Sequence, residues 1–161
     1  MAEDRQHPLR RGLSIHEGVL YGADAAVGKW VASRVPGYAL SPASTALGVV
    51  RGGKMVAGVI YERFNGVHCE ATIAAAPGSS WASRRVLHRI FAYPFLQLGC
   101  EAISVCIAMT NLPSMNLATK LGFAPEALVT FAAHDGSTLV ILKAHRETCR
   151  WIRGETDGQQ G

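Results

Sequence analysis

The stretch Ala108–Phe123, AMTNLPSMNLATKLGF, carries the clearest structural pattern in the chain. The apolar run Ile103–Ala108 before it predicts a strand that ends near Asn111. Pro113 stands where a helix can begin, because the N–H that proline lacks has no partner in the first turn of a helix. Gly122 suits the left-handed residue that closes a helix. The stretch therefore predicts a strand, an asparagine at its end, and a short helix.

Upstream of this stretch, two pairs of residues predict tight hairpin turns. Gly52-Gly53 and Asn65-Gly66 are both turn sequences that join antiparallel strands. They separate three apolar segments, which we expect to form a three-stranded meander over Ala46–Arg51, Lys54–Phe64 and Val67–Ala76.

The Asn65-Gly66 turn also predicts how its two strands pair. A two-residue turn places Phe64 opposite Val67. Side chains of paired residues point to the same face, and faces alternate along a strand. This register would gather four side chains on one face near the turn: Tyr61, Arg63, His68 and Glu70.

The rest of the chain alternates between helical and strand patterns. We expect helices from Asp24 to about Arg34 and from about Trp81 to Leu98, and a terminal hairpin of Ala127–Ala133 and Ser137–Lys143. His145–Arg153 is expected to close the chain as a short helix. The order predicts an α/β (α+β) domain with a mixed, mostly antiparallel sheet of about six or seven strands flanked by helices.

Length and composition favour one globular domain. The chain has 161 residues, of which 48% are hydrophobic and 17% are charged. We expect a flexible basic arm over residues 1–12, the domain over 13–153 and a flexible tail over 154–161. No apolar run reaches about 18 residues, so no membrane helix is expected. The N-terminus lacks the apolar core of a secretion signal, which favours the cytoplasm.

The four cysteines are scattered and form no C-x-x-C pair. Such spacing predicts reduced, buried thiols and no metal site. Cys106, in the middle of a predicted strand, is expected to lie in the core.

The residues after the strand that ends at Ala108 carry a family resemblance. Six positions match the pattern N-x-x-A/S-x-x-hydrophobic-Y-x-K-x-G-F: Asn111, Ser114, Leu117, Lys120, Gly122 and Phe123. This pattern resembles the second half of the GNAT acyltransferases (GCN5-related N-acetyltransferases). Ala118 stands where that family usually has tyrosine.

The resemblance implies an N-acyltransferase that moves an acyl group from acetyl-CoA, or a related acyl-CoA, to a primary amine. It implies that the central strands ending at Ala76 and Ala108 splay apart to hold the donor. Phosphate would lie at the start of the following helix, where free N–H groups and the helix dipole favour anions. The implied donor-binding residues are Ala75, Ala76, Ser80, Trp81, Ala82, Ser83, Arg84, Arg85, Asn111, Ser114 and Lys120.

One part of the sequence departs from the family. The segment GSSWAS, residues 78–83, lacks the paired glycines of the usual pyrophosphate motif. Serine and alanine still leave backbone N–H groups open, and two arginines follow. The alternative for this segment is an ordinary capped helix with solvated arginines.

For the reaction, a base must take a proton from the attacking amine. The resemblance makes Glu70 the first candidate, and His68 is the second because histidine titrates near neutral pH. Tyr61, Tyr38 or Tyr93 could supply the acid in place of the missing tyrosine, or water could serve. The alternative is a solvated strand face with an Arg63–Glu70 ion pair.

A second class of function is nucleic-acid binding. The net charge is +4, and GNAT-like DNA-modifying proteins of the phage Mom type lack the usual acetyl-CoA motif. Tyr38 or Trp81 would then stack on bases. The phosphate contacts would be Arg146, Arg150 and Arg153, joined by Arg10 and Arg11. A protein that binds CoA without catalysis is a third option, and the family resemblance leaves a homodimer open.

Overall fold

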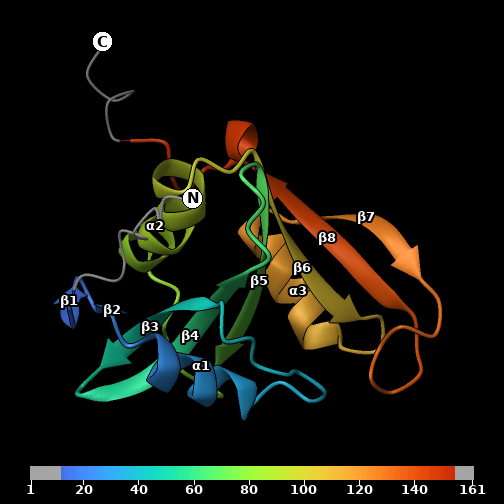
Figure 1. The fold of residues 1–161 in the computed structure, drawn as a ribbon, viewed down its shortest axis with the longest axis horizontal. Coiled ribbons are helices and arrows are strands. Elements are labelled where there is room, and N and C mark those ends of the chain that lie inside the picture. The colour runs from blue at the N-terminus through green and yellow to red at the C-terminus, as the bar shows by residue number, and fades with distance from the viewer. Residues whose placement is uncertain (1–11, 155–161) are drawn as a thin grey trace, which may run out of the picture.

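The computed structural model describes residues 12–154, which form an eight-stranded sheet flanked by helices (Figure 1). The elements in chain order are β1 (Ser14–His16), β2 (Val19–Tyr21), α1 (Asp24–Ala32), β3 (Thr45–Arg51), β4 (Lys54–Glu62), β5 (His68–Ala75), α2 (Arg84–Ala92), the π-helical turn Tyr93–Gln97, β6 (Ala102–Ala108), α3 (Leu112–Leu121), β7 (Ala124–Val129), β8 (Leu139–His145) and the 3₁₀ turn Arg146–Thr148. The basic arm, with Arg10 and Arg11, and residues 155–161 of the predicted tail lie outside the described residues.

The sheet is mixed and mostly antiparallel, as the sequence predicted. Its strand order is β1-β2-β3-β4-β5-β6-β8-β7, and only β5 and β6 are parallel neighbours among the described strands. The described strands number eight rather than six or seven, because the first segment folds as a hairpin, β1 and β2, around Glu17-Gly18. β7 is an edge strand, and all six of its residues are exposed.

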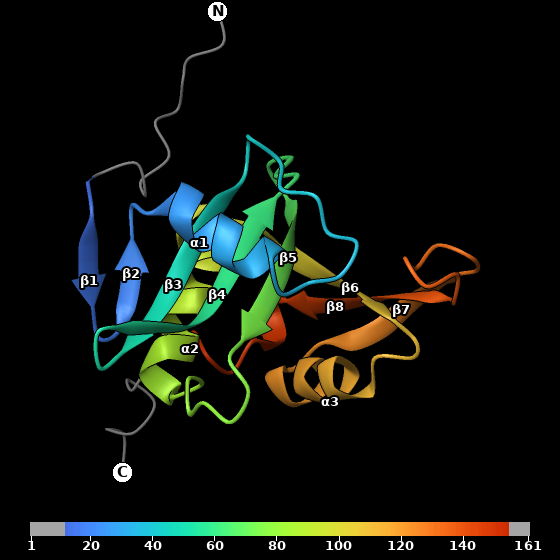
Figure 2. The same cartoon turned by 90° about the horizontal axis from the view of Figure 1, so that it is seen from below.

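Helices cover both faces of the sheet. Figure 2 shows α1 on one face and α2 with α3 on the other. Val27 and Val31 of α1 pack against Ile60 of β4. Gly58 permits this approach, because a Cβ atom there would lie 2.6 Å from Cγ2 of Val31. The larger core lies on the opposite face, where Phe91 and Phe95 of the α2 segment are buried.

The predicted register at Asn65-Gly66 is wrong by one residue. Glu62 pairs with Glu70 and Tyr61 with Ala71. The reason is a longer loop: the Asn65 side chain accepts hydrogen bonds from the backbone N–H groups of residues 67 and 68, and Arg63 takes a left-handed conformation. A one-residue shift moves a side chain to the other face. Tyr61 therefore lies on the α2 face, away from Glu70.

The helix after β5 begins later than predicted. α2 starts at Arg84, and the Ser83 side chain caps it by accepting a hydrogen bond from the Val86 N–H. Trp81 precedes the helix and packs into the core, with 6% of its surface exposed. The π-helical turn contains Pro94, which cannot donate a backbone hydrogen bond inside a regular helix.

The strand and the short helix predicted on either side of Asn111 are both present. β6 spans Ala102–Ala108, and α3 spans Leu112–Leu121 and is closed by Gly122, whose φ is 105°. The C-terminal prediction is wrong: residues 146–148 form only a 3₁₀ turn. Beyond this turn the Trp151 indole N–H donates to the Leu121 carbonyl at 2.8 Å, which ties the chain to the end of α3.

In the described part of the chain, no helix has the length and apolar character to cross a bilayer.

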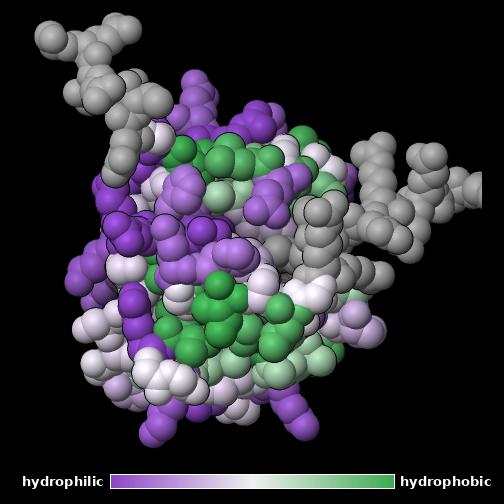
Figure 3. All heavy atoms as spheres, turned by 90° about the vertical axis from the view of Figure 1, so that its left-hand side faces the viewer, coloured by the Kyte–Doolittle hydropathy of each residue, from purple (hydrophilic) through white to green (hydrophobic). Residues whose placement is uncertain are grey.

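Figure 3 shows the β1 side of the molecule, where hydrophobic areas interrupt a hydrophilic surface. Ile15 on β1 and Leu13 just before it are 58% and 73% exposed.

Candidate active site

A cavity opens where β5 and β6 separate. The two strands pair only at His68–Ala102, Cys69–Ile103 and Glu70–Ser104. Beyond Glu70 they diverge, and a cavity of about 720 Å³ lies between them. Consecutive residues of both strands line it, Ala71–Ala75 and Val105–Ala108, so side chains from both faces of the sheet reach it. The splayed strands expected from the family resemblance are present, and the cavity passes through the sheet.

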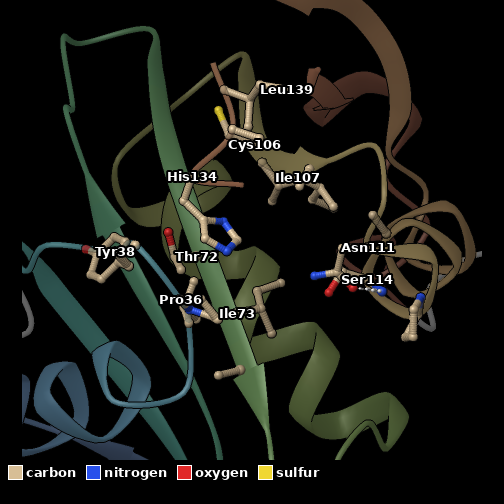
Figure 4. Close-up of a pocket in the computed structure, with 18 of the residues that line it drawn as sticks. Pro36, Tyr38, Thr72, Ile73, Cys106, Ile107, Asn111, Ser114, His134 and Leu139 are labelled. Atoms are coloured by element: carbon tan, nitrogen blue, oxygen red, sulfur yellow. Dashed lines mark hydrogen bonds between the residues drawn. The ribbon is translucent and has the colours of Figure 1, made fainter. Parts of the chain in front are cut away.

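The first wall of the cavity is the β6–α3 junction. Asn111, Ser114, Leu117 and Ala118 line this side. The Asn111 side chain caps α3, with Oδ1 accepting from the Ser114 N–H at 3.3 Å. Ala118, at the position where the family pattern has tyrosine, is buried and presents only a methyl group to the cavity. Figure 4 shows Asn111 and Ser114 side by side at this wall.

The second wall consists of two loops that meet across the opposite opening. One follows α1 and contributes residues 34–38; the other joins β7 to β8 and contributes residues 132–134. Gly37 and His134 are the contact, since a Cβ atom on Gly37 would lie 2.5 Å from the Cβ of His134. Gly37 has a φ of 75°, which glycine adopts readily and other residues rarely do. We call residues 34–38 and 132–134 together the loop wall.

Polar side chains gather on the α1 face beside the paired end of β5 and β6. The Arg63 guanidinium lies 3.3 Å from the Glu70 carboxylate. His68 Nε2 and Ser104 Oγ are 2.6 Å apart. Burial lowers the pKa of His68, and the nearby Lys143 lowers it further. The neutral imidazole is therefore the favoured form of His68 at neutral pH.

Behind the loop wall lies a buried carboxylate. Glu62 is 7% exposed, and its Oε1 accepts a hydrogen bond from the Tyr38 hydroxyl at 3.0 Å. Burial and this bond to Glu62 raise the pKa of Tyr38 well above its usual value. Glu62 and Glu70 are paired residues on neighbouring strands, so two carboxylates share this side of the sheet.

The structure brings together only some of the residues predicted to bind the donor. Ala75, Asn111 and Ser114 line the cavity. Ala76 and Ser80–Arg85 follow β5 outside the cavity lining, and Arg84 and Arg85 are exposed at the start of α2. Lys120 also lies outside the lining; its carbonyl accepts a hydrogen bond from Arg150.

The three predicted catalytic residues lie in two separate places. Glu70 and His68 are on the α1 face near the paired end of the strands. Tyr61 is buried on the opposite face, where its hydroxyl donates to the Ile90 carbonyl at 2.7 Å and its ring meets Tyr93 edge-on. The predicted grouping of Tyr61 with Glu70 is therefore absent.

The expectation that Cys106 lies in the core is wrong. It is exposed rather than buried, and it lines the cavity with the loop wall (Figure 4). β6 stays paired with β8 at this point, but β5 has diverged and no longer covers Cys106 from the other side. Partial burial and the charge of Glu70 raise the pKa of the Cys106 thiol. The other three cysteines are free and buried, as expected.

Sequence reasoning missed two residues of the loop wall, Gly37 and His134. The Pro36-Gly37 pair signalled the end of α1, and His134-Asp135-Gly136 signalled a turn. Each signal correctly predicted its own turn. Neither signal says that the two turns touch, because that contact depends on how β7 and β8 are placed relative to α1.

The basic tail gives no added support to nucleic-acid binding. Arg146 is paired with Glu101 at 2.5 Å. Arg153 donates to the Glu147 carbonyl at 3.1 Å, and Arg150 lies over the Trp151 ring at 4.3 Å. The buried position of Trp81 leaves it unable to stack on a base. Within residues 12–154, no group of three metal-ligating side chains could hold a metal ion.

Known structures share this architecture. A chimera of the spermidine N-acetyltransferase SpeG from Vibrio cholerae and hSSAT superposes with a TM-score of 0.60 and 18% identity, over 71% of this chain and 72% of the other. The ribosomal-protein-S5-alanine acetyltransferase of Vibrio fischeri gives 0.55 and 15%, over 66% and 64%. Campylobacter jejuni N-acetyltransferase PseH, in complex with acetyl coenzyme A, gives 0.50 and 12%, over 65% and 70%.

Sequence comparison adds no closer relationship: no protein-family model matches this chain, and neither does any curated protein sequence. The structural matches, all below 20% identity, establish the fold. It is the fold of the GNAT N-acetyltransferases.

Proposed function

We propose that the protein is an N-acyltransferase that uses acetyl-CoA, or a related acyl-CoA, to acylate a primary amine. The observation that carries this proposal is the cavity between β5 and β6, which passes through the sheet and has different walls on its two sides. A donor could enter from the α3 side and an acceptor from the loop-wall side, so both would meet in the same space.

The residues at the α3 side suit the donor. The lining from β5, β6 and α3 is largely aliphatic, which suits the slender acyl end of an acyl-CoA. Asn111 and Ser114 add polar groups for its amides. Arg84 and Arg85 are exposed at the start of α2, where cations and helix N–H groups would favour phosphate. The bound thioester supplies an activated acyl carbon.

The acceptor side carries the negative charge that an amine needs. Glu70 lies outside the lining, yet its charge raises the pKa of both Tyr38 and Cys106, which line the cavity. On β5 it directly precedes Ala71, the first residue of that strand in the lining. We propose that Glu70 acts through a water molecule, as a base for the ammonium form of the acceptor and as a counter-charge for it.

Calorimetry tests the donor half of this proposal. The purified protein is titrated with acetyl-CoA, with free CoA and duplex DNA as parallel ligands. We expect micromolar binding of both CoA species. Binding to DNA alone, weakening steeply with salt, would instead favour the nucleic-acid function.

A transfer assay tests the acceptor half. Release of free CoA thiol is followed with three amines: spermidine, a peptide with a free N-terminal alanine, and an α-amino-blocked lysine. We expect at least one to be acylated, and we expect Glu70→Gln to lower the rate about tenfold while acetyl-CoA binding is kept. An unchanged rate in Glu70→Gln would remove Glu70 from the mechanism.

A further inference from the structure

His134 is a titratable side chain that lies in the cavity and has no part in the function proposed above. It belongs to the β7–β8 loop and lines the cavity with Tyr38 and Cys106. Figure 4 shows its imidazole beside Thr72 of β5, on the side of the cavity opposite Asn111. Among the described residues, no hydrogen bond engages the ring. Its nitrogen atoms are therefore available to a bound molecule.

The backbone of the loop that carries His134 is held on two sides. On one side the His134 Cβ packs against Gly37, where an added Cβ atom would lie 2.5 Å from it. On the other side Asp135 holds the loop to the end of β6: its Oδ2 accepts from Thr110 Oγ1 at 2.7 Å, and its Oδ1 accepts from the Ser137 N–H at 2.9 Å. The Met109 N–H donates to the Thr138 carbonyl at 2.9 Å.

This loop is therefore anchored directly beside Asn111. The same short segment, residues 109–111, holds the β7–β8 loop and begins the α3 wall. The backbone that carries the exposed His134 imidazole is held in one place relative to the donor side of the cavity. Such fixed placement is what a proton-transferring group needs.

The other titratable groups around the cavity are poor proton acceptors at neutral pH. Arg34 is cationic, and the pKa values of Tyr38 and Cys106 are raised by burial and by neighbouring carboxylates. Asp135 beside His134 is an anion whose pKa is lowered to about 2 by Ser137 and Thr110, so it is a weak base. Glu70 stands behind the wall. Histidine is the side chain suited to exchange a proton near pH 7.

We infer that His134 is a catalytic residue that contacts the acceptor amine and accepts its proton. The inference rests on the proposed function and deepens it. The amine nitrogen forms a bond to the acyl carbon, the carbon–sulfur bond breaks, and the imidazole takes the proton that the nitrogen loses. The CoA thiolate leaves and is protonated in turn by the imidazolium. Glu70 acts before this step: through water it takes the extra proton of the ammonium form and passes it to solvent, and its negative charge then favours the imidazolium.

The test compares His134→Gln with wild type in the transfer assay, using whichever of the three amines reacts fastest. We expect kcat to fall on the order of 10²-fold and the near-neutral limb of the kcat–pH profile to disappear. Acetyl-CoA affinity, measured by calorimetry, should stay within about twofold of wild type, because the α3 wall is untouched. His16→Gln, on β1 at the other edge of the sheet, is the matched control and should behave as wild type.

A second variant separates chemistry from structure. In His134→Ala we expect added imidazole to restore part of the lost rate, which a purely structural role would not allow. A kcat within threefold of wild type in His134→Gln, or an unchanged pH limb, overturns the inference while the proposed function stands. A wild-type protein that neither binds acetyl-CoA nor acylates an amine overturns both.

Discussion

The two walls of the cavity are built in different ways. The α3 wall comes from one continuous segment, in which Asn111 caps the helix that it begins. The loop wall comes from two turns that are distant in the sequence and meet at Gly37 and His134. A wall made by local hydrogen bonds keeps its shape when distant parts change. A wall made by one tight contact does not, so we expect the two walls to respond differently to substitution.

The largest effect is expected at the contact itself. Gly37→Ala would place a methyl group 2.5 Å from the His134 Cβ, at a φ that alanine rarely adopts. We expect the loops to separate and the acyl-transfer rate to fall on the order of 10²-fold, because displacements of about 1 Å in a reacting geometry cost that much. Acetyl-CoA affinity, measured by calorimetry, should change little. An equal loss of affinity would show that the two walls are not independent.

The matched control for this substitution is Gly52→Ala in the β3–β4 turn. Gly52 also has a positive φ, 55°, but an added Cβ there meets nothing within 4 Å. It therefore carries the backbone strain without the collision. We expect Gly52→Ala to lower stability modestly and to leave the transfer rate unchanged.

The next effect concerns stability at the loop wall. Tyr38→Phe removes the hydroxyl that donates to the buried Glu62 carboxylate. A buried acceptor left without its donor costs about 1–3 kcal/mol. We expect urea unfolding to show a loss of this size. In a Glu62→Gln background the same change should cost less, and an equal cost in both backgrounds would contradict the assigned role of the hydrogen bond.

A smaller effect is expected at the α3 wall. Asn111→Ala removes the cap of α3 and should lower the free energy of unfolding by about 1 kcal/mol. It should also weaken acetyl-CoA binding if Asn111 contacts the donor. Asn116→Ala, at an exposed position of the same helix, is the control and should be neutral or slightly stabilising. Unchanged acetyl-CoA affinity in Asn111→Ala would confine Asn111 to the helix cap.

The smallest effect is a pH dependence at the paired end of β5 and β6. The pKa of His68 is lowered in the folded protein, so the unfolded chain binds more protons as the pH falls through about 6.5. Folding stability should therefore be full above that pH and should decrease below it. We expect His68→Gln to flatten this part of the stability–pH curve measured by thermal unfolding. An identical curve would show that His68 does not contribute.

Local signals in the sequence predicted much of the fold correctly. β6 and the end of α3 follow from an apolar run, a proline and a glycine, each of which acts within a few residues. The Asn65-Gly66 turn shows the limit of such signals. The dipeptide correctly predicted a hairpin, but the asparagine side chain bonds the backbone of residues 67 and 68 and lengthens the loop. That local competition shifted the register and separated Tyr61 from Glu70.

The candidate site divides in the same way. The α3 wall follows from local sequence, because Asn111, Ser114 and the helix they begin are specified by neighbouring residues. Two other features do not: the separation of β5 from β6 that exposes Cys106, and the meeting of Gly37 with His134. Both depend on contacts between segments far apart in the chain. No local pattern encodes them, because each loop is an ordinary turn until the packed sheet brings both to one opening.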